Sequence, residues 1–498
     1  MQTVSGCRFP LKNCDHLSVD PGPYKRRRTS HCLNRVWKRS QILDLCLVTN
    51  TIVKVKIWPE LAGLLRLGIP IIFTQLLQVS QGTIAIIMMG RVGSLELAAV
   101  GLGTSFWVFV WLGSMGLLMG LSPTIAQHQG AGRHLEMRSD FQQGLWMALV
   151  IGLLAFILMR NIGGVMDLVG VDPQVIPLVK SYLEIGSWSM PAVCLYLVMR
   201  FFCEATGNSR PMMVIQILVL PLVVFGNWVL IYGNLGFPAL GVDGAALTFT
   251  GGLILVAILL SGYMLFTPKY RELGLFTGLT FPVFARVGVL FRLGVPISIS
   301  LILDSAFFNA INLLMGRFGH VALAAHQLVI NYTTVIFMVA VGISSAVMAR
   351  VGQSVGSGHM AQVRLRGWLG VATSTVLMLP SVLFMIMFPR IIASIYTSEP
   401  GVTDVAVSLL MAAALFQLFD GLYMAGAGAL RGLKDVTAVM WISVLSYWIV
   451  GFPVAWIMGL NWGPVGLWYG MVVGIGLTAI LLGWRFELKS RQLLASND

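Results

Sequence analysis

The sequence predicts an all-α polytopic membrane protein with twelve transmembrane helices. Hydrophobic residues make up 57% of the 498 residues and charged residues only 11%, well below the roughly 25% charged residues of soluble domains. Mean hydropathy is +0.83. A helix needs about 20 apolar residues to cross the hydrocarbon core. Such runs recur between polar breaks, and they predict spans at residues 66–90, 96–122, 142–162, 178–202, 211–232, 241–266, 288–316, 320–349, 364–389, 404–430, 437–458 and 464–486.

An internal repeat divides these spans into two halves of six. Residues 66–70 (RLGIP) return as residues 292–296 (RLGVP), and residues 89–93 (MGRVG) return as 315–319 (MGRFG), both at an offset of 226 residues. Each half crosses the membrane an even number of times, so the copies have parallel topology and are related by an axis along the membrane normal. The expected architecture is two pseudo-symmetric six-helix lobes around a central cavity.

The predicted domains follow from the repeat. An N-lobe (58–266) and a C-lobe (288–490) are joined by a polar cytoplasmic loop (267–287), and a short cytoplasmic tail (491–498) follows. The start of the chain, residues 1–57, is a basic cytoplasmic tail without the apolar run of about 7–15 residues that a signal peptide needs. We interpret this tail as disordered, as a segment lying on anionic lipid headgroups, or as the product of a mis-annotated start codon.

The net charge of +13 does not indicate a nucleic-acid partner, because the basic residues collect in alternate loops of a membrane chain. One set of loops carries most of them, including Arg133, Arg271, Arg366, Arg431 and Lys434. By the positive-inside rule these loops face the cytoplasm. The same rule, with an even number of spans, places both termini in the cytoplasm.

Two carboxylates lie inside apolar spans. Asp304 is eight residues after Pro296 and twelve before Gly316, so it lies roughly 12–18 Å from either end of its helix, and Asp420 lies within the tenth span. A central Asp costs about 2.5–3.5 kcal/mol on insertion, so an acid at this depth indicates an ion or substrate pathway. The alternative is a structural hydrogen bond between helices. No Lys or Arg is expected at the same depth, and Gln78, the repeat counterpart of Asp304, is uncharged.

Neutral oxygens accompany both acids at helical spacing. Gln417 and Tyr423 broadly share a face with Asp420, while Asn309 and Asn312 follow Asp304 along its helix. Such oxygens suit a hard cation, which prefers several oxygen ligands. We therefore predict that these six residues bind the cation and the substrate, and that the two aspartates hold Na⁺ or carry H⁺. Glu204 is a further candidate, for which a place at the membrane interface is the alternative.

Several motifs occur in a familiar order: residues 89–93 (MGRVG), 96–100 (ELAAV), 324–327 (AAHQ) and 429–432 (ALRG). This pattern resembles the multidrug and toxic compound extrusion (MATE) family, nearest its bacterial NorM-like branch, over about residues 58–490. The resemblance implies antiport in a bacterial inner membrane. A Na⁺ ion or a proton would move inward through an alternating-access protein while a drug, often an organic cation, moves outward. No cofactor beyond the coupling ion is implied.

The resemblance also assigns roles to residues and shows departures. Asp420 matches the family's acid in the tenth span, and Asp304 occupies the place where NorM-like members usually carry glutamate. Many members carry an Asp-Thr pair in the first span, where this chain has Ala85–Ile86. A family asparagine of the fifth span aligns with Val223, although Asn227, a further candidate, is kept. We therefore expect the C-lobe acids to carry the coupling.

The sequence favours a multidrug efflux antiporter, coupled to Na⁺ or H⁺, that exports amphiphilic, often cationic compounds as a monomer surrounded by membrane lipids. One alternative is a flippase or exporter of a lipid-linked or amphiphilic metabolite with the same fold. A membrane-embedded enzyme would need a metal triad or a nucleophile–base pair inside the spans, and His326 alone does not supply one, so we expect no enzyme. Antiport requires Asp304 and Asp420 to face one cavity.

Overall fold

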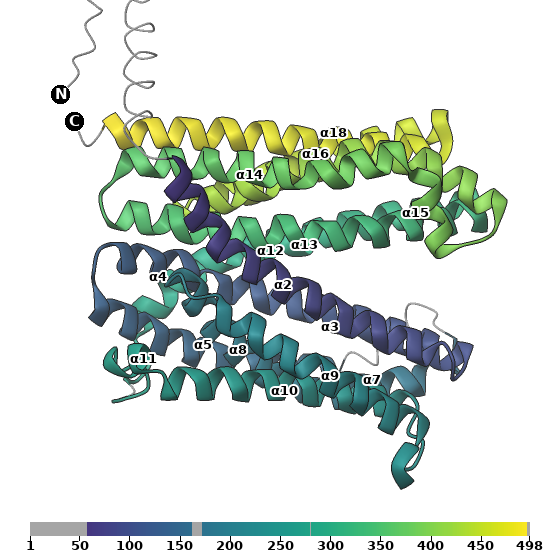
Figure 1. Ribbon diagram of the computed structural model, residues 1–498, viewed down its shortest axis with the longest axis horizontal. Coiled ribbons are helices and arrows are strands. Elements are labelled where there is room, and N and C mark those ends of the chain that lie inside the picture. The colour runs from purple at the N-terminus through teal and green to yellow at the C-terminus, as the bar shows by residue number, and fades with distance from the viewer. Residues whose placement is uncertain (1–56, 162–171, 279, 496–498) are drawn as a thin grey trace, which may run out of the picture. The chain divides into compact units, whose positions relative to one another are not determined.

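A computed structural model describes residues 57–161, 172–278 and 280–495, and no strand occurs in these ranges. The predicted basic tail, apart from its last residue, lies outside the described residues, and so do the last three residues of the chain. The described residues form helices joined by short connections (Figure 1).

Long helices make up most of the described chain. They are α2 (Ile57–Met89), α3 (Ser94–Met119), α4 (Leu121–Gly130), α5 (His134–Asn161), α7 (Ile176–Ser187), α8 (Ser189–Ala205), α9 (Arg210–Tyr232), α10 (Val242–Phe266), α12 (Phe284–Met315), α13 (His320–Gly356), α14 (Met360–Met387), α16 (Pro400–Gly432), α17 (Val436–Ser443) and α18 (Phe452–Ala495). Shorter elements are η1 (Asn234–Gly236), α11 (Pro268–Glu272), η2 (Gly316–Phe318), α15 (Pro389–Tyr396) and a π-helical segment, η3 (Val444–Gly451).

The number of spans follows from length, composition and one reversal. Ten helical stretches of the described chain are long and apolar enough to cross a membrane, and the pair α7 and α8, bent by 45°, adds an eleventh. The last stretch, Val436–Ala495, breaks at Gly463, where φ is 64°. Fifteen residues of continuous helix would separate Ala455 from Gly470 by about 22 Å. The two backbones are instead in contact, since a Cβ on Gly470 would lie closer than 3.0 Å to the Ala455 backbone. The chain therefore turns back at Gly463, and the predicted all-α fold with twelve spans is confirmed.

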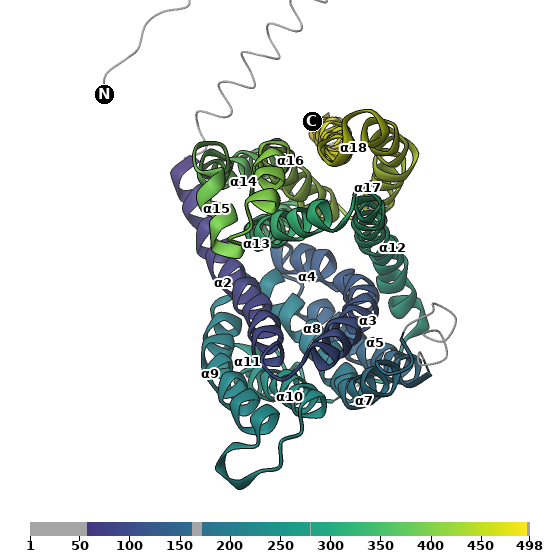
Figure 2. The ribbon, with the colours of Figure 1, turned by 90° about the vertical axis from the view of Figure 1, so that its right-hand side faces the viewer.

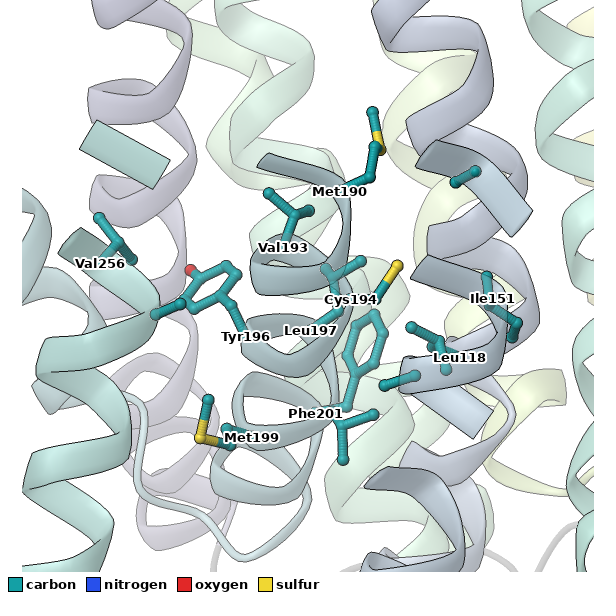
Figure 3. Packing of buried hydrophobic residues seen from close by; sticks show 14 of the residues in the cluster. Leu118, Ile151, Met190, Val193, Cys194, Tyr196, Leu197, Met199, Phe201 and Val256 are labelled. Carbon is teal, nitrogen blue, oxygen red and sulfur yellow. The ribbon is translucent and has the colours of Figure 1, made fainter. Parts of the chain in front are cut away.

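Buried apolar side chains gather into two clusters. We call α2–α10 the N-lobe and α12–α18 the C-lobe, because one cluster is built mainly from the former and the other mainly from the latter. Figure 3 shows part of the first cluster around Tyr196 and Phe201 of α8. Two helices cross this division. Leu64 of α2 belongs to the C-lobe cluster and Leu290 of α12 to the N-lobe cluster, so the first helix of each half ties the two lobes together.

Figure 2 shows α2 running from the helices of one lobe to those of the other, and its contacts with α9 and α13 agree. Pro70 lies inside α2 and Pro296 inside α12, at repeat-related positions. Membrane helices tolerate such prolines because neighbouring helices can satisfy the freed backbone groups. The two crossing helices, α2 and α12, are thus each the first helix of their half, and each contains a proline at the same repeat position.

The lobes are in direct contact at the end that carries the basic loops, which we call the basic end. The contact is made by glycines. A Cβ on Gly130 would lie closer than 3.0 Å to the Gln353 carbonyl oxygen, and one on Gly356 equally close to the Gln127 carbonyl oxygen. Both glycines and both glutamines are related by the repeat offset of 226. The seam between the lobes is therefore one contact made twice, and only residues without a Cβ fit it.

Side-chain hydrogen bonds reinforce this seam symmetrically. Gln127 Nε2 donates to the Gly432 carbonyl oxygen at 3.0 Å, and Gln353 Nε2 donates to the Ala205 carbonyl oxygen at 2.8 Å. Ala205 and Gly432 are 227 residues apart, so the repeat gains one residue before these positions. In this structure the lobes are joined at the basic end.

Candidate functional site

The two predicted acids come from different helices and line one cavity. Asp304 of α12 and Asp420 of α16 face a space of about 380 Å³, whose lining also includes Val108 and Leu112 of α3. The cavity therefore lies between the N-lobe and the C-lobe. Asp420 is only 4% exposed and Asp304 is partly buried, and both side chains line the cavity inside the protein.

Small residues position α16 and its acid. Ala425, Ala427 and Ala429 are fully buried, and a Cβ on Gly428 would lie closer than 3.0 Å to the Ser344 carbonyl oxygen of α13. Small side chains let membrane helices approach closely. This explains why α16 packs among α13, α14 and α18 in the middle of the C-lobe, with Asp420 at the edge of the cavity.

Asp304 is held by a tyrosine. Tyr423 Oη donates a hydrogen bond of 2.6 Å to Asp304 Oδ2, while Asp304 Oδ1 is buried and has no hydrogen-bond partner in the described part of the chain. Hydrogen bonds to a carboxylate are short and strong. The bond fixes the orientation of the carboxylate and leaves its second oxygen available to a cation or a proton.

Aromatic rings and thioethers form much of the cavity wall. Phe308 packs edge-on against Phe416, with centroids 5.9 Å apart, and Tyr423 packs edge-on against Tyr447 at 6.0 Å. Met338 and Met424 complete this part of the lining. Aromatic faces attract organic cations, and methionine adapts to ligands of varied shape. The wall therefore suits a flat apolar body that carries positive charge.

Neutral oxygens beside the acids fit a small hard cation. Ser305, Asn309, Thr333 and Thr334 line the cavity. Asn309 Nδ2 donates to the Ser305 carbonyl oxygen at 2.9 Å, which leaves the side-chain oxygen of Asn309 available as an acceptor. Hydroxyl, amide and carboxylate oxygens are the ligands that hard cations take. The donor set fits Na⁺, and the two carboxylates alone fit a proton.

Two predicted residues lie outside this cavity. Gln417 is buried, and its Nε2 lies 3.6 Å from the Met378 sulfur of α14. The stripe of α16 that faces the cavity contains Phe416, Asp420 and Tyr423, and Gln417 lies about 100° around the helix from Phe416. Asn312 accepts a hydrogen bond of 2.9 Å from Gln327 Nε2 and also lies outside the cavity lining.

Glu204 and Asn227 are buried within the N-lobe, each 1% exposed, and neither lines the cavity. Glu204 Oε1 accepts a hydrogen bond of 2.7 Å from Arg200 Nε, one turn earlier on α8. Asn227 Oδ1 has no hydrogen-bond partner among the described residues. Glu204 is one residue from the end of α8, and its place at the membrane interface stays an alternative prediction.

The N-lobe counterpart of the acidic site has no charge. Gln78 Nε2 donates to Tyr196 Oη at 3.4 Å, and these residues correspond by the repeat to Asp304 and Tyr423. Val223 is buried in apolar surroundings. The arrangement of tyrosine and partner is thus kept in both lobes, while the carboxylate is present only in the C-lobe.

The charge pattern places Arg431 in a polar loop, and this expectation is wrong. Arg431 lies in the last turn of α16 and is only 2% exposed. It follows Asp420 by eleven residues, about three helical turns, so it continues the cavity-facing stripe beneath the acid. The spacing of eleven residues from Asp420 is the signal in the sequence that predicts a cavity-facing position for Arg431.

Comparisons with known proteins agree with the fold and the repeat. The model of the MatE family matches residues 70–229 and again residues 296–457, and the two matches begin 226 residues apart, as the repeat does. The chain is 32% identical over 432 residues to the multidrug resistance protein NorM of Aliivibrio fischeri, covering 86% of this chain and 94% of that protein.

Two further matches are of the same kind. The chain is 31% identical over 440 residues to the multidrug resistance protein MdtK of Yersinia pseudotuberculosis, covering 87% of this chain and 96% of that protein. Among solved structures, its fold is similar to that of the eukaryotic MATE transporter AtDTX14, with a TM-score of 0.80 and 20% identity, over 89% of this chain and 100% of that chain.

Proposed function

Because the chain belongs to the MatE family of multidrug and toxic compound extrusion transporters, we propose that it exports amphiphilic, often cationic compounds in exchange for Na⁺ or H⁺. One observation carries the proposal: Asp304 and Asp420 line one cavity between the lobes. Relatives at 31–32% identity carry the name of multidrug resistance proteins. This multi-pass membrane protein is a transporter rather than an enzyme, as its family indicates.

Exchange follows from competition for the same carboxylates. A Na⁺ ion or a proton at Asp304 and Asp420 neutralises the charge that an organic cation would otherwise use. Both acids line one cavity of about 380 Å³, so the coupling ion and the organic cation must use the same two carboxylates. Binding of one ligand therefore weakens binding of the other, and occupancy alternates between them.

Alternating access requires the seam at the basic end to open. The seam includes glycine contacts and side-chain hydrogen bonds from Gln127 and Gln353, and Arg286 Nη1 of α12 lies 3.1 Å from Asp140 Oδ1 of α5. Ion pairs add to it: Arg366 Nε lies 2.8 Å from Glu60 Oε2, joining α14 of the C-lobe to α2 of the N-lobe. A ligand can shift this equilibrium only by binding one state more tightly than the other.

We place the protein in a bacterial inner membrane with the basic end and both termini in the cytoplasm, since the basic loops gather at that end. In that orientation the described structure is closed toward the cytoplasm. Both lobes and the whole cavity come from one chain, so a monomer surrounded by lipid is sufficient for transport. Drug-like organic cations are the substrates, and no cofactor beyond the coupling ion is required.

Export of a lipid-linked or amphiphilic metabolite is the second candidate, and one observation favours it. An apolar groove of about 700 Å³ on the outer side of α3, α5 and α12 is lined by residues such as Phe109, Leu154 and Phe291. Gly113 lines this groove, while Leu112 beside it lines the central cavity. An acyl chain could lie in the groove while a polar headgroup occupies the cavity.

Transport in proteoliposomes tests the proposal and chooses the ion. Vesicles loaded with a fluorescent organic cation would be given a Na⁺ gradient or a proton gradient, each imposed alone. We expect one of the two gradients to accelerate movement of the cation against its own gradient. Acceleration by neither gradient, together with movement of a fluorescent lipid between leaflets, would instead support the second candidate.

A further inference from the structure

Arg431 is a buried cation on the basic side of the acidic cavity. Its Nε and Nη2 atoms are buried, and the residues that the structure describes offer neither of them a hydrogen-bond partner. A long side chain on a helix points back toward the N-terminal end of that helix, so the guanidinium is directed from the basic end toward Tyr423 and Asp420. Helical register places Arg431 about two turns after Tyr423 and three turns after Asp420, on the same side of α16.

The N-lobe shows that the fold can neutralise a charge at this position. With the offset of 227 residues that relates Ala205 to Gly432, Arg431 corresponds to Glu204, which pairs with Arg200 one turn earlier. The residue one turn before Arg431 is Ala427, which has no charge to offer. Burial of an unpaired charge is costly, so the C-lobe retains a destabilising charge that the N-lobe neutralises.

Polar groups continue beyond the cavity on the same side. Ser443 of α17 and Ser446 of the π-helical segment η3 are buried, and the Ser446 hydroxyl has no hydrogen-bond partner among the described residues. Both elements pack against α12, which carries Asp304. π-helical turns occur often at functional sites, and buried hydroxyl groups without protein partners are places where ordered water binds. Buried polar groups of the C-lobe thus lie on elements that pack against the helix of Asp304, within about ten residues of the start of α17.

A coupling cation at the acids therefore has two routes. One leads back into the cavity, where substrate competes for the same site. The other would lead through the C-lobe interior, past Arg431, to the basic end. Passage by the second route would dissipate the gradient without export, so tight coupling requires that route to be blocked.

We infer that Arg431 is an electrostatic barrier which prevents the coupling ion from crossing the C-lobe without exchange. A fixed arginine charge excludes cations and protons from narrow polar pores, and an unpaired guanidinium keeps its full charge for this purpose. The inference rests on the proposed function, because it concerns the ion that occupies Asp304 and Asp420. Arg431 acts on the ion through its charge and is not a ligand.

The test measures ion flux without substrate. Proteoliposomes that contain the full chain would receive a Na⁺ or proton gradient, and uptake of ²²Na⁺ or the signal of an internal pH dye would be followed. Arg431→Met removes the charge at similar length. Flux should rise about tenfold, since one charge a few helical turns away at an effective protein dielectric is worth about that factor. The melting temperature should stay the same or rise, because a buried unpaired charge is lost.

Control variants separate charge from packing. Arg431→Lys keeps the charge and should leak as little as the wild type, whereas Arg431→Gln removes it and should leak like Arg431→Met. Arg292→Gln removes an exposed charge from α12 and should leave the flux unchanged. A structural role for Arg431 would lower the melting temperature without increasing substrate-free flux.

Each outcome bears on a different claim. Wild-type flux in folded Arg431→Met and Arg431→Gln variants that still exchange substrate would overturn the barrier and leave the proposed function intact. Failure of both charge-free variants to fold would show that the charge is structural and would also overturn it. A wild type that exchanges no substrate against either gradient would overturn the proposed function, and the inference with it.

Discussion

Tyr423 Oη lies 2.6 Å from Asp304 Oδ2 and donates a hydrogen bond to it. The repeat places Tyr196 and Gln78 at the corresponding positions of the N-lobe, where the distance is 3.4 Å and the acceptor is the tyrosine hydroxyl. The same pair of positions thus carries a strong charged contact in one lobe and a weak neutral one in the other. The two lobes thus share one fold but differ in charge at this pair, and the proposed coupling by the C-lobe acids depends on that difference.

Replacement of Tyr423 by phenylalanine should weaken cation coupling without unfolding the protein. The variant loses the only hydrogen bond to Asp304 Oδ2 that the described residues provide, and a bond to a charged group contributes about 1.5–3 kcal/mol. We expect the concentration of coupling ion that gives half-maximal exchange to change by about tenfold. Tyr196→Phe is the matched control, since it removes the weaker bond of the N-lobe. Equal effects of the two variants would contradict the asymmetry.

A methyl group in the seam should force the lobes apart at the basic end. A Cβ in the variant Gly356→Ala would meet the carbonyl oxygen of Gln127 at less than 3.0 Å, and backbone atoms cannot give way as a flexible side chain can. Spin labels on α4 and α13 would report the separation by pulsed electron resonance. We expect a shift toward longer distances. Gly101→Ala, where nothing lies within 4 Å, serves as control, and an unchanged distribution in Gly356→Ala would show that the seam does not hold the closed state.

The buried pair of the N-lobe should contribute to stability. Arg200→Met leaves the Glu204 carboxylate buried and unpaired, which typically costs about 3–5 kcal/mol. Thermal unfolding of the purified protein in detergent would measure the loss. The double variant Arg200→Met with Glu204→Leu removes both charges and should recover most of the melting temperature. A single variant as stable as the wild type would mean that Glu204 finds another partner.

Gln417 should be dispensable for transport although it is only three residues from Asp420. Its side chain faces the Met378 sulfur, and its Oε1 is buried without a partner. Gln417→Met should therefore leave exchange unchanged and keep or raise stability, since it removes an unsatisfied buried oxygen. Exchange by Asn309→Ala, which alters the cavity lining, should fall. A loss of exchange in Gln417→Met would place Gln417 on the transport path.

The sequence predicted the spans and the acids well because both depend on hydropathy. Apolar runs define helices in lipid whatever their neighbours, and an acid such as Asp304 stands out against them. The repeat then placed the lobes and identified Gln78 as an uncharged counterpart. The meeting of Asp304 and Asp420 in one cavity required only that each lie at mid-depth on a helix that faces the centre.

The rest depended on helix rotation and packing, which hydropathy does not encode. Gln417 and Asp420 are three residues apart, yet only Asp420 faces the cavity. Gln417 lies about 60° around the helix from Asp420, on the side away from Phe416 and Tyr423. Arg431 follows the pattern of a loop cation, but α16 continues to Gly432 and buries it. The crossing of α2 and α12 between the lobes arises from contacts that have no signature in a single sequence.

The measurement that tests the central claim most directly is ion-driven efflux of an organic cation from proteoliposomes by Asp304→Asn and Asp420→Asn. Both variants keep the shape of the side chain and remove its charge, and Asp404→Asn, an exposed acid on α16, controls for general effects of the substitution. We predict that the first two variants fold but lose efflux driven by either gradient, while the third transports normally. Efflux at the wild-type rate in both Asp304→Asn and Asp420→Asn would contradict the account.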